Sequence, residues 1–118
     1  MPKKKKGSSA SKILIVVILI AIVSFAVVGW HDGLIGVTPM GSINDFTIDS
    51  GTAVTVKGNI TLILLTVVTI VDSTGGVAFE WADAGSLTLH SVVVVRGVVF
   101  SLHILTDVSS VAPVWLFA

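Results

Sequence analysis

The sequence contains no cysteine and no tyrosine, and only three of its 118 residues are proline. Without cysteine the chain can form neither a disulfide nor a thiolate nucleophile, whichever compartment it occupies. Charged residues are also scarce, at 12%. The sequence shows no nucleophile–base pair, no glycine-rich phosphate-binding loop and no cluster of carboxylates with a basic partner. These absences predict a protein that is not an enzyme.

The few charges are segregated along the chain, which the formal net charge of zero hides. Residues 1–30 carry five lysines and no acid, a charge of +5, whereas residues 31–118 carry Lys57 and Arg96 against seven acids, a charge of −5. Nucleic-acid affinity depends largely on Lys and Arg that neutralise phosphates. The acidic balance of residues 31–118 therefore argues against nucleic acid as a partner.

One long hydrophobic run dominates the N-terminal part. Residues 13–29 contain no charge, and a helix of this length rises roughly 25 Å, enough for a thin hydrocarbon core. Lysines precede the run, and Trp30 follows it where an interfacial indole is expected. The pattern predicts a single-pass anchor in the cell membrane, with the N-terminus in the cytoplasm and the rest of the chain on the extracytoplasmic side.

A cleaved signal peptide is the alternative interpretation of this run. Ser24-Phe25-Ala26 resembles a cleavage site with small residues. The apolar run nevertheless continues to Gly29 and Trp30, which favours a retained anchor. Both interpretations take the later residues out of the cytoplasm.

The residues after the anchor have the patterning of β-strands. Apolar and polar side chains alternate from Thr52 onward, and turn-forming residues separate the runs. Gly58 and Gly97 interrupt two long strands, where a bulge or bend would fit. We predict five strands, over residues 52–64, 66–71, 77–83, 91–102 and 103–114, and no helix after Trp30.

Five strands with glycine-interrupted long members predict an all-β fold: a five-stranded OB-fold barrel preceded by a single N-terminal transmembrane helix. A β-sandwich would need about seven strands. We divide the chain into a basic cytoplasmic tail without regular structure (1–12), the anchor (13–30), a linker (31–51) and the OB-fold domain (52–118).

The first hairpin has unusual turn chemistry. Residues 61–66, Thr-Leu-Ile-Leu-Leu-Thr, contain no Gly, Pro, Asn or Asp. The leucines either pack within the domain or form an exposed apolar lip that contacts lipid, an apolar ligand or a partner protein.

Several segments together resemble the cytochrome c maturation haem-chaperone (CcmE-like) family of membrane-anchored OB domains. The similar segments are the anchor, Val37-Thr-Pro-Met-Gly-Ser-Ile43, Gly51-Thr-Ala-Val-Thr-Val-Lys-Gly58, Thr69-Ile-Val-Asp-Ser-Thr-Gly-Gly-Val77, Ser91-Val-Val-Val-Val-Arg-Gly97 and His103-Ile-Leu-Thr-Asp-Val108. The resemblance implies a carrier or assembly role in haem handling or cytochrome c maturation. Its implied partners are the membrane, haem and cytochrome c assembly proteins.

The chain departs from that family at the haem-binding tail. The family binds haem through a His or Cys four residues before a Tyr, and here no His follows His103. The resemblance therefore implies a degenerate member without covalent haem. His90 and His103 remain the candidates for contact with a haem cofactor, although a lone histidine on a strand more often packs or faces solvent. No spacing of ligand residues predicts a metal site.

Two other groups of residues bear on function. Phe79, Trp81 and Phe100 either stack on a single-stranded nucleic acid or, as the period of two favours, fill the barrel core. Asp72 is expected to form a turn, and Glu80 and Asp83 to be solvated. The alternative to the haem-handling role is an OB-fold module that binds nucleic acid or another protein.

Overall fold

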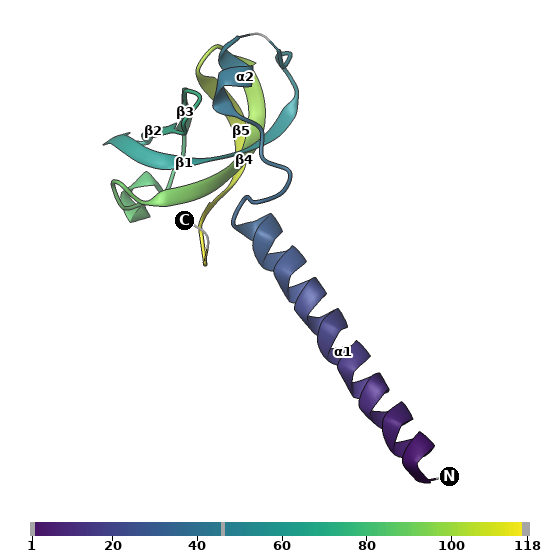
Figure 1. Cartoon of the computed structure of the whole chain (residues 1–118). Helices are drawn as coiled ribbons and strands as arrows, with labels where there is room; N and C mark the ends of the chain where they lie inside the picture. The colour runs from purple at the N-terminus through teal and green to yellow at the C-terminus, as the bar shows by residue number, and fades with distance from the viewer. Residues whose placement is uncertain (1, 46, 117–118) are drawn as a thin grey trace.

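A computed structural model describes residues 2–45 and 47–116, and their side chains from residue 10 onward. Figure 1 shows a long helix, α1 (Pro2–His31), that projects from a small β-barrel. The molecule measures 69 × 31 × 23 Å. The remaining elements are α2 (Met40–Asn44), β1 (Ala53–Leu64), β2 (Val67–Val71), β3 (Gly76–Glu80), the 3-10 turn η1 (Ala84–Ser86), β4 (Val92–Ser101) and β5 (Ile104–Pro113).

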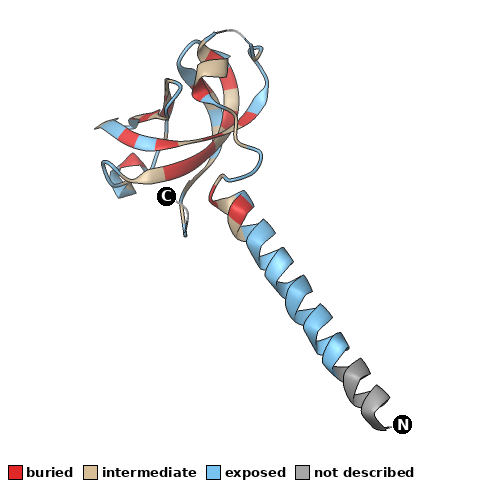
Figure 2. Ribbon diagram, in the orientation of Figure 1, coloured by how far each residue is buried: buried red, intermediate tan, exposed pale blue. Residues whose placement is uncertain are grey.

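Helix α1 contains a stretch, Ala10–His31, that is long and apolar enough to cross a membrane. Its side chains are exposed from residue 10 through residue 27, as the pale blue ribbon in Figure 2 shows. The expected tail without regular structure is not seen, because α1 already begins at Pro2. Proline is well suited to the first helical position, and lysine is a good helix former.

Helix α1 ends in a Schellman motif. Gly33 adopts a left-handed φ of 75°, the Leu34 N–H donates to the Gly29 carbonyl at 2.7 Å, and the Gly33 N–H donates to the Trp30 carbonyl at 3.4 Å. A Cβ on Gly33 would lie 3.1 Å from Lys57 Cδ and 3.2 Å from Val94 Cγ2. The end of the helix therefore packs directly on strands β1 and β4.

The five strands form a closed barrel in the order β1-β2-β3-β5-β4. All neighbours are antiparallel except β3 and β5. Alternate side chains of β1 to β3 point inward, as the period-two pattern predicts. The all-β barrel with one N-terminal apolar helix confirms the predicted fold class.

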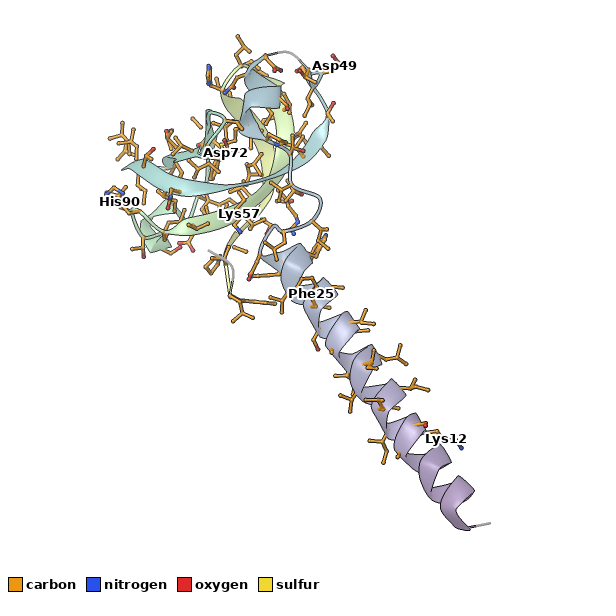
Figure 3. The ribbon with its side chains drawn as sticks, viewed as in Figure 1. Lys12, Phe25, Asp49, Lys57, Asp72 and His90 are labelled. Carbon is orange, nitrogen blue, oxygen red and sulfur yellow. The ribbon has the colours of Figure 1, made fainter. Side chains whose placement is uncertain are left out.

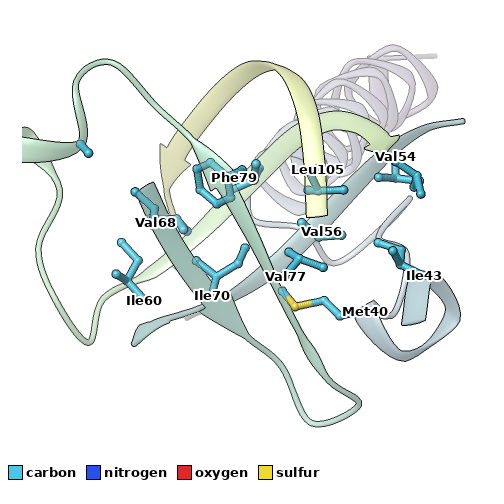
Figure 4. Close-up of a cluster of buried hydrophobic side chains, with 14 residues drawn as sticks. Met40, Ile43, Val54, Val56, Ile60, Val68, Ile70, Val77, Phe79 and Leu105 are labelled. Carbon is cyan, nitrogen blue, oxygen red and sulfur yellow. The ribbon is translucent and has the colours of Figure 1, made fainter. Parts of the chain in front are cut away.

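The core lies inside the barrel and is closed at one end by α2. Figure 4 shows Met40 and Ile43 of α2 beside the inward-facing strand residues. No helix was predicted in this segment, because a five-residue helix is too short to show a helical period. The predicted linker therefore contributes two core side chains. The buried apolar residues are Met40, Ile43, Val54, Val56, Ile60, Val68, Ile70, Val77, Phe79, Ala84, Val93, Val94, Val95, Val99 and Leu105.

The two strand glycines have different roles. Gly97 lies where the β4–β5 register shifts, between the pairs Arg96–Ser110 and Val98–Thr106, so the expected irregularity is present. Gly58 lies in an unbroken β1–β4 register, and the shift in β1 occurs later, between Ile60 and Leu62. Of the two features predicted at Gly58, a bulge or a bend, the bulge is therefore contradicted, and the lack of a side chain there allows a close approach of β2.

Asp72 joins the β2–β3 turn to α2, as expected of a turn-forming residue. Its Oδ1 accepts from the Thr74 N–H at 2.7 Å, the Thr74 hydroxyl at 2.6 Å and the Gly75 N–H at 2.9 Å, and its Oδ2 accepts from the Met40 N–H at 3.0 Å. Partial burial raises the pKa of the Asp72 carboxyl, whereas these hydrogen bonds together lower it by more. The pKa of Asp72 therefore lies below the ordinary 3.8.

Asp72→Asn is expected to remove one source of acid sensitivity. A depressed folded pKa means that the ionised carboxylate stabilises the fold above its unfolded pKa, and this stabilisation is lost as pH falls through the lower folded value. At neutral pH the variant should be less stable than wild type by about 1–2 kcal/mol. Below about pH 4 wild type should lose stability, and the stability of the variant should change less. Urea unfolding from pH 7 to pH 2 measures this, with the exposed Asp49→Asn as the control. Equal pH dependence in wild type and Asp72→Asn would contradict the assignment.

Candidate functional site

An open cleft of about 750 Å³ lies between the end of β3 and the first half of β5. The only residue pair joining these two described strands is Ala78 with Ile104. After it, β5 passes through Asp107, whose φ of 47° is left-handed, and through the irregular pairing opposite Gly97. Strand β3 ends two residues after Ala78, at Glu80. The cleft thus arises because the two strands separate just beyond their single pair.

The lining of the cleft is mainly apolar. Its two ionisable side chains are both acids, Glu80 and Asp107, and neither Lys nor Arg lines it. Phe100 is 60% exposed, which is unusual for a phenylalanine on a strand. The lining residues are Thr66, Val67, Ala78, Phe79, Glu80, Ala82, Phe100, Ile104, Leu105, Thr106, Asp107 and Val108.

Phe100 also borders a second apolar hollow. This hollow of about 420 Å³ lies beside α2 and is lined by Ile43, Ile48, Ser50, Val99, Phe100, Ser101 and Leu102. The Phe100 side chain therefore stands between two hollows. A ligand in the cleft can contact its ring without opening the barrel core.

The tip of the first hairpin forms an exposed apolar lip, which we define as Leu62, Leu64, Leu65 and Val67. All four side chains are exposed, and Leu65 is the most exposed at 88%. The prediction that these leucines pack within the domain is wrong, and the alternative of an exposed lip is confirmed. Val67 belongs to both surfaces, so the lip is continuous with the cleft.

The lip has an unfavourable backbone conformation. Leu64 pairs with Val67, which leaves a two-residue turn, and Leu65 takes the first turn position with a φ of 55°. Glycine is the residue favoured at such a position, and a bulky residue at positive φ is strained. An exposed and strained leucine is a structural cost that suggests a role in binding.

Leu65→Gly is expected to preserve or increase stability while reducing binding. The substitution relieves a strain of about 1–3 kcal/mol, which offsets the roughly 0.5–1 kcal/mol entropy cost of glycine. Chemical unfolding of the full chain measures the change, and Leu89→Gly, at another exposed leucine whose backbone is not left-handed, is the control. A loss of stability larger than that of the control would show that Leu65 is held by packing.

The structure does not gather the histidines into one site. His90 and His103 are both exposed, lie in turns with φ values of 67° and 62°, and do not line the cleft. His103 Nδ1 lies 3.1 Å from the Gly76 carbonyl oxygen, and Figure 3 places His90 at the edge of the barrel. Within residues 2–45 and 47–116, no group of three or more metal-ligating side chains could hold an ion.

The three aromatic residues proposed as a stacking platform do not share one surface. Phe79 is buried in the core, and Trp81 is half-buried against it, as the core interpretation predicts. Phe100 differs, because the inward positions near the end of β4 are Gly97 and Val99. The alternation itself assigns Phe100 to the outer face, a signal that grouping it with the core aromatics overlooked. The expected solvation of Glu80 and Asp83 is consistent with their exposure.

The comparisons with known proteins identify the fold. No family model matches the sequence, and no curated protein matches it. Three solved structures resemble the barrel over 66% of this chain. They are the S. pombe Stn1–Ten1 complex (TM-score 0.56, 15% identity, 74% of that chain), the S. pombe telomere capping protein Ten1 (0.56, 14%, 79%) and the hypothetical protein YgiW from E. coli (0.54, 24%, 89%). At these identities the likeness concerns the fold alone, and it supports an OB-fold.

Proposed function

We propose that this chain is a membrane-anchored OB-fold binding module, not an enzyme, and that its cleft holds an extended apolar segment of a partner protein. The observation that carries the proposal is the cleft between β3 and β5, with its apolar lining and two acidic side chains. The continuous lip extends the same apolar surface.

The strand edges at the cleft favour an extended segment as the occupant. The Ala78 N–H donates to the His103 carbonyl at 2.7 Å, which directs it toward β5. Because alternate residues of a strand direct their N–H groups to the same side, the Glu80 N–H also faces the cleft. An added strand can pair with this edge and place every second side chain on the apolar lining.

The charges at the cleft favour a protein over a nucleic acid. Glu80 and Asp107 complement lysines or arginines that flank the apolar residues of a partner, and they repel phosphates. The Stn1–Ten1 complex is one case of an OB-fold protein joined to a protein partner. That similarity makes a protein partner reasonable for this fold.

Haem handling, the role implied by the CcmE-like resemblance, has less support. Cleft volume and apolar lining are compatible with an apolar ligand, but neither His90 nor His103 lines the cleft. If haemin binds, we expect no covalent adduct and no dependence on either histidine. A Soret shift abolished by His103→Ala would instead identify that residue as an iron ligand. The tail residues Phe117 and Ala118, part of the hydrophobic tail where that family carries its haem ligand, lie outside the described residues.

The anchor and its orientation are part of the proposal. Apolar side chains cover α1, and the flanking lysines favour a cytoplasmic N-terminus. Protease added outside spheroplasts should therefore digest the barrel and spare an N-terminal tag. When glutamate replaces Lys3, Lys4, Lys5, Lys6 and Lys12, we expect the chain to insert in both orientations, so that part of the barrel is protected from the protease. A barrel protected in the wild type would contradict the extracytoplasmic placement.

Selection from a random peptide library, with the full chain in nanodiscs as bait, tests the cleft directly. We expect enriched peptides to alternate apolar residues and to carry Lys or Arg at their ends. Phe100→Asp should remove their binding, and tryptophan fluorescence, to which the half-buried Trp81 contributes, should verify that this variant stays folded. Enriched peptides that bind Phe100→Asp equally, or that carry acidic ends, would contradict the proposal.

A further inference from the structure

The C-terminal segment folds back onto the end of α1, far from it in sequence. Asp32, the residue before the helix-terminating Gly33, is completely buried. One of its carboxylate oxygens accepts from the Trp115 N–H at 2.6 Å, and the other accepts from the Leu116 N–H at 2.7 Å. A buried carboxylate that accepts two backbone hydrogen bonds fixes the position of the segment that donates them.

Ring contacts reinforce this attachment. The His31 imidazole stacks on the Trp115 indole with centroids 3.4 Å apart, and His31 Nε2 lies 2.8 Å from the Pro113 carbonyl oxygen. Arg96 places its guanidinium 4.0 Å from the centroid of the Trp30 ring and donates to the Trp30 carbonyl at 3.2 Å. The end of β5 and the middle of β4 are therefore both joined to the last turn of α1.

Apolar side chains remain exposed around this junction. We define a collar as Trp30, Leu34, Ile35, Trp115 and Leu116, all of which are exposed, Leu116 at 72%. Lys57 and Arg96, the two Lys or Arg residues of 31–118, also lie at this end of the barrel. Aromatic and aliphatic side chains beside cations are typical of groups at a membrane–water interface.

From this arrangement we infer that the collar lies in the headgroup region of the bilayer that α1 enters, so that Trp115 and Leu116 form a second membrane contact. The inference rests on the proposed anchoring by α1. The position of the collar identifies the membrane as the surface that it contacts, because the apolar surface of α1 continues to Trp30 and the collar surrounds that point. Two contacts separated in sequence hold the barrel at one orientation to the membrane, whereas a helix alone would let it swing.

Single-cysteine labelling tests the inference on the full chain, because the natural sequence has no cysteine to remove. Bimane is attached to Leu116→Cys, to Val27→Cys within α1, and to Asp49→Cys, which Figure 3 places at the end of the barrel away from α1. Quenching by spin-labelled lipids is then measured in phosphatidylcholine–phosphatidylglycerol vesicles. We expect quenching at residues 27 and 116 and none at residue 49.

The outcomes separate this inference from the anchoring on which it rests. Quenching at residue 27 with none at residue 116 would overturn the second contact and leave the anchor intact. No quenching at residue 27 would overturn the anchor itself. When Asp32→Ala is combined with Leu116→Cys, quenching at residue 116 should fall. When it is combined with Val27→Cys, quenching at residue 27 should stay the same. Unchanged quenching at residue 116 would show that Asp32 does not position the segment.

Discussion

Gly58→Ala is expected to destabilise the barrel more than other single-methyl additions. A Cβ at this position would lie 2.4 Å from the Val71 carbonyl oxygen and 2.7 Å from Met40 Cε. The methionine can move, but the carbonyl belongs to β2 and cannot shift without disturbing its pairing with Asn59. We expect a loss of roughly 3 kcal/mol or more, a large part of the 5–15 kcal/mol that stabilises a typical domain.

Near-UV circular dichroism of the full chain in detergent measures this unfolding through the tryptophans, of which Trp81 is half-buried against the core, and it avoids the far-UV backbone signal of α1. The melting temperature should fall by more than about 10 °C. Gly85→Ala is the matched control, because a Cβ there meets no atom within 4 Å and the φ of Gly85 is not left-handed. Equal melting of both variants would show that β2 does not approach Gly58 as closely as the structure has it.

Charge reversal at the cleft is expected to weaken binding strongly. Lysine in place of both Glu80 and Asp107 puts like charges against a peptide with basic ends. We expect affinity for a selected peptide to fall about 10- to 100-fold, equivalent to about 1.4–2.8 kcal/mol. A version of the peptide with glutamates in place of its terminal lysines should bind the double-lysine variant more tightly than it binds the wild-type protein.

Fluorescence anisotropy of labelled peptide measures both affinities. Asp83→Lys is the control, because Asp83 is also exposed and is close in sequence to Glu80, yet it does not line the cleft. If Asp83→Lys weakens binding as much as reversal at the cleft, the effect comes from the overall charge of the domain. If neither variant weakens binding, the cleft is not the peptide site.

The positions of the strands along the chain were predictable because local signals specify them. Alternation from Val54 to Ile60 and the Asp72–Gly76 turn chemistry are properties of neighbouring residues, and all five strands lie close to their predicted ranges. The apolar helix was predictable for the same reason, because its run of apolar residues is continuous in the sequence. The extra helical turns before Ile13 were missed because a lysine-rich segment carries no apolar period.

The candidate site was less predictable because long-range contacts create it. The cleft depends on how β3 and β5 separate after Ala78 and Ile104, which are 26 positions apart in the chain. Burial of Asp32 depends on Trp115 and Leu116, and no nearby residue signals it. The same junction covers the outer face of β4, which explains why Val93, Val94 and Val95 are all buried where alternation predicts an exposed middle residue. The exposed leucines of the lip, by contrast, were one of two stated alternatives.

Hydrogen–deuterium exchange on the full chain in nanodiscs, with and without a selected peptide, tests the central claim most directly. If an extended segment adds to the free edges of the cleft, the amides of residues 80 and 82 in and after β3 and of residues 106–108 in β5 should exchange more slowly in the complex. The amides of residues 84–86 in η1, away from the cleft, should be unaffected. Protection absent from both edges of the cleft, at peptide concentrations that saturate binding, would contradict the account.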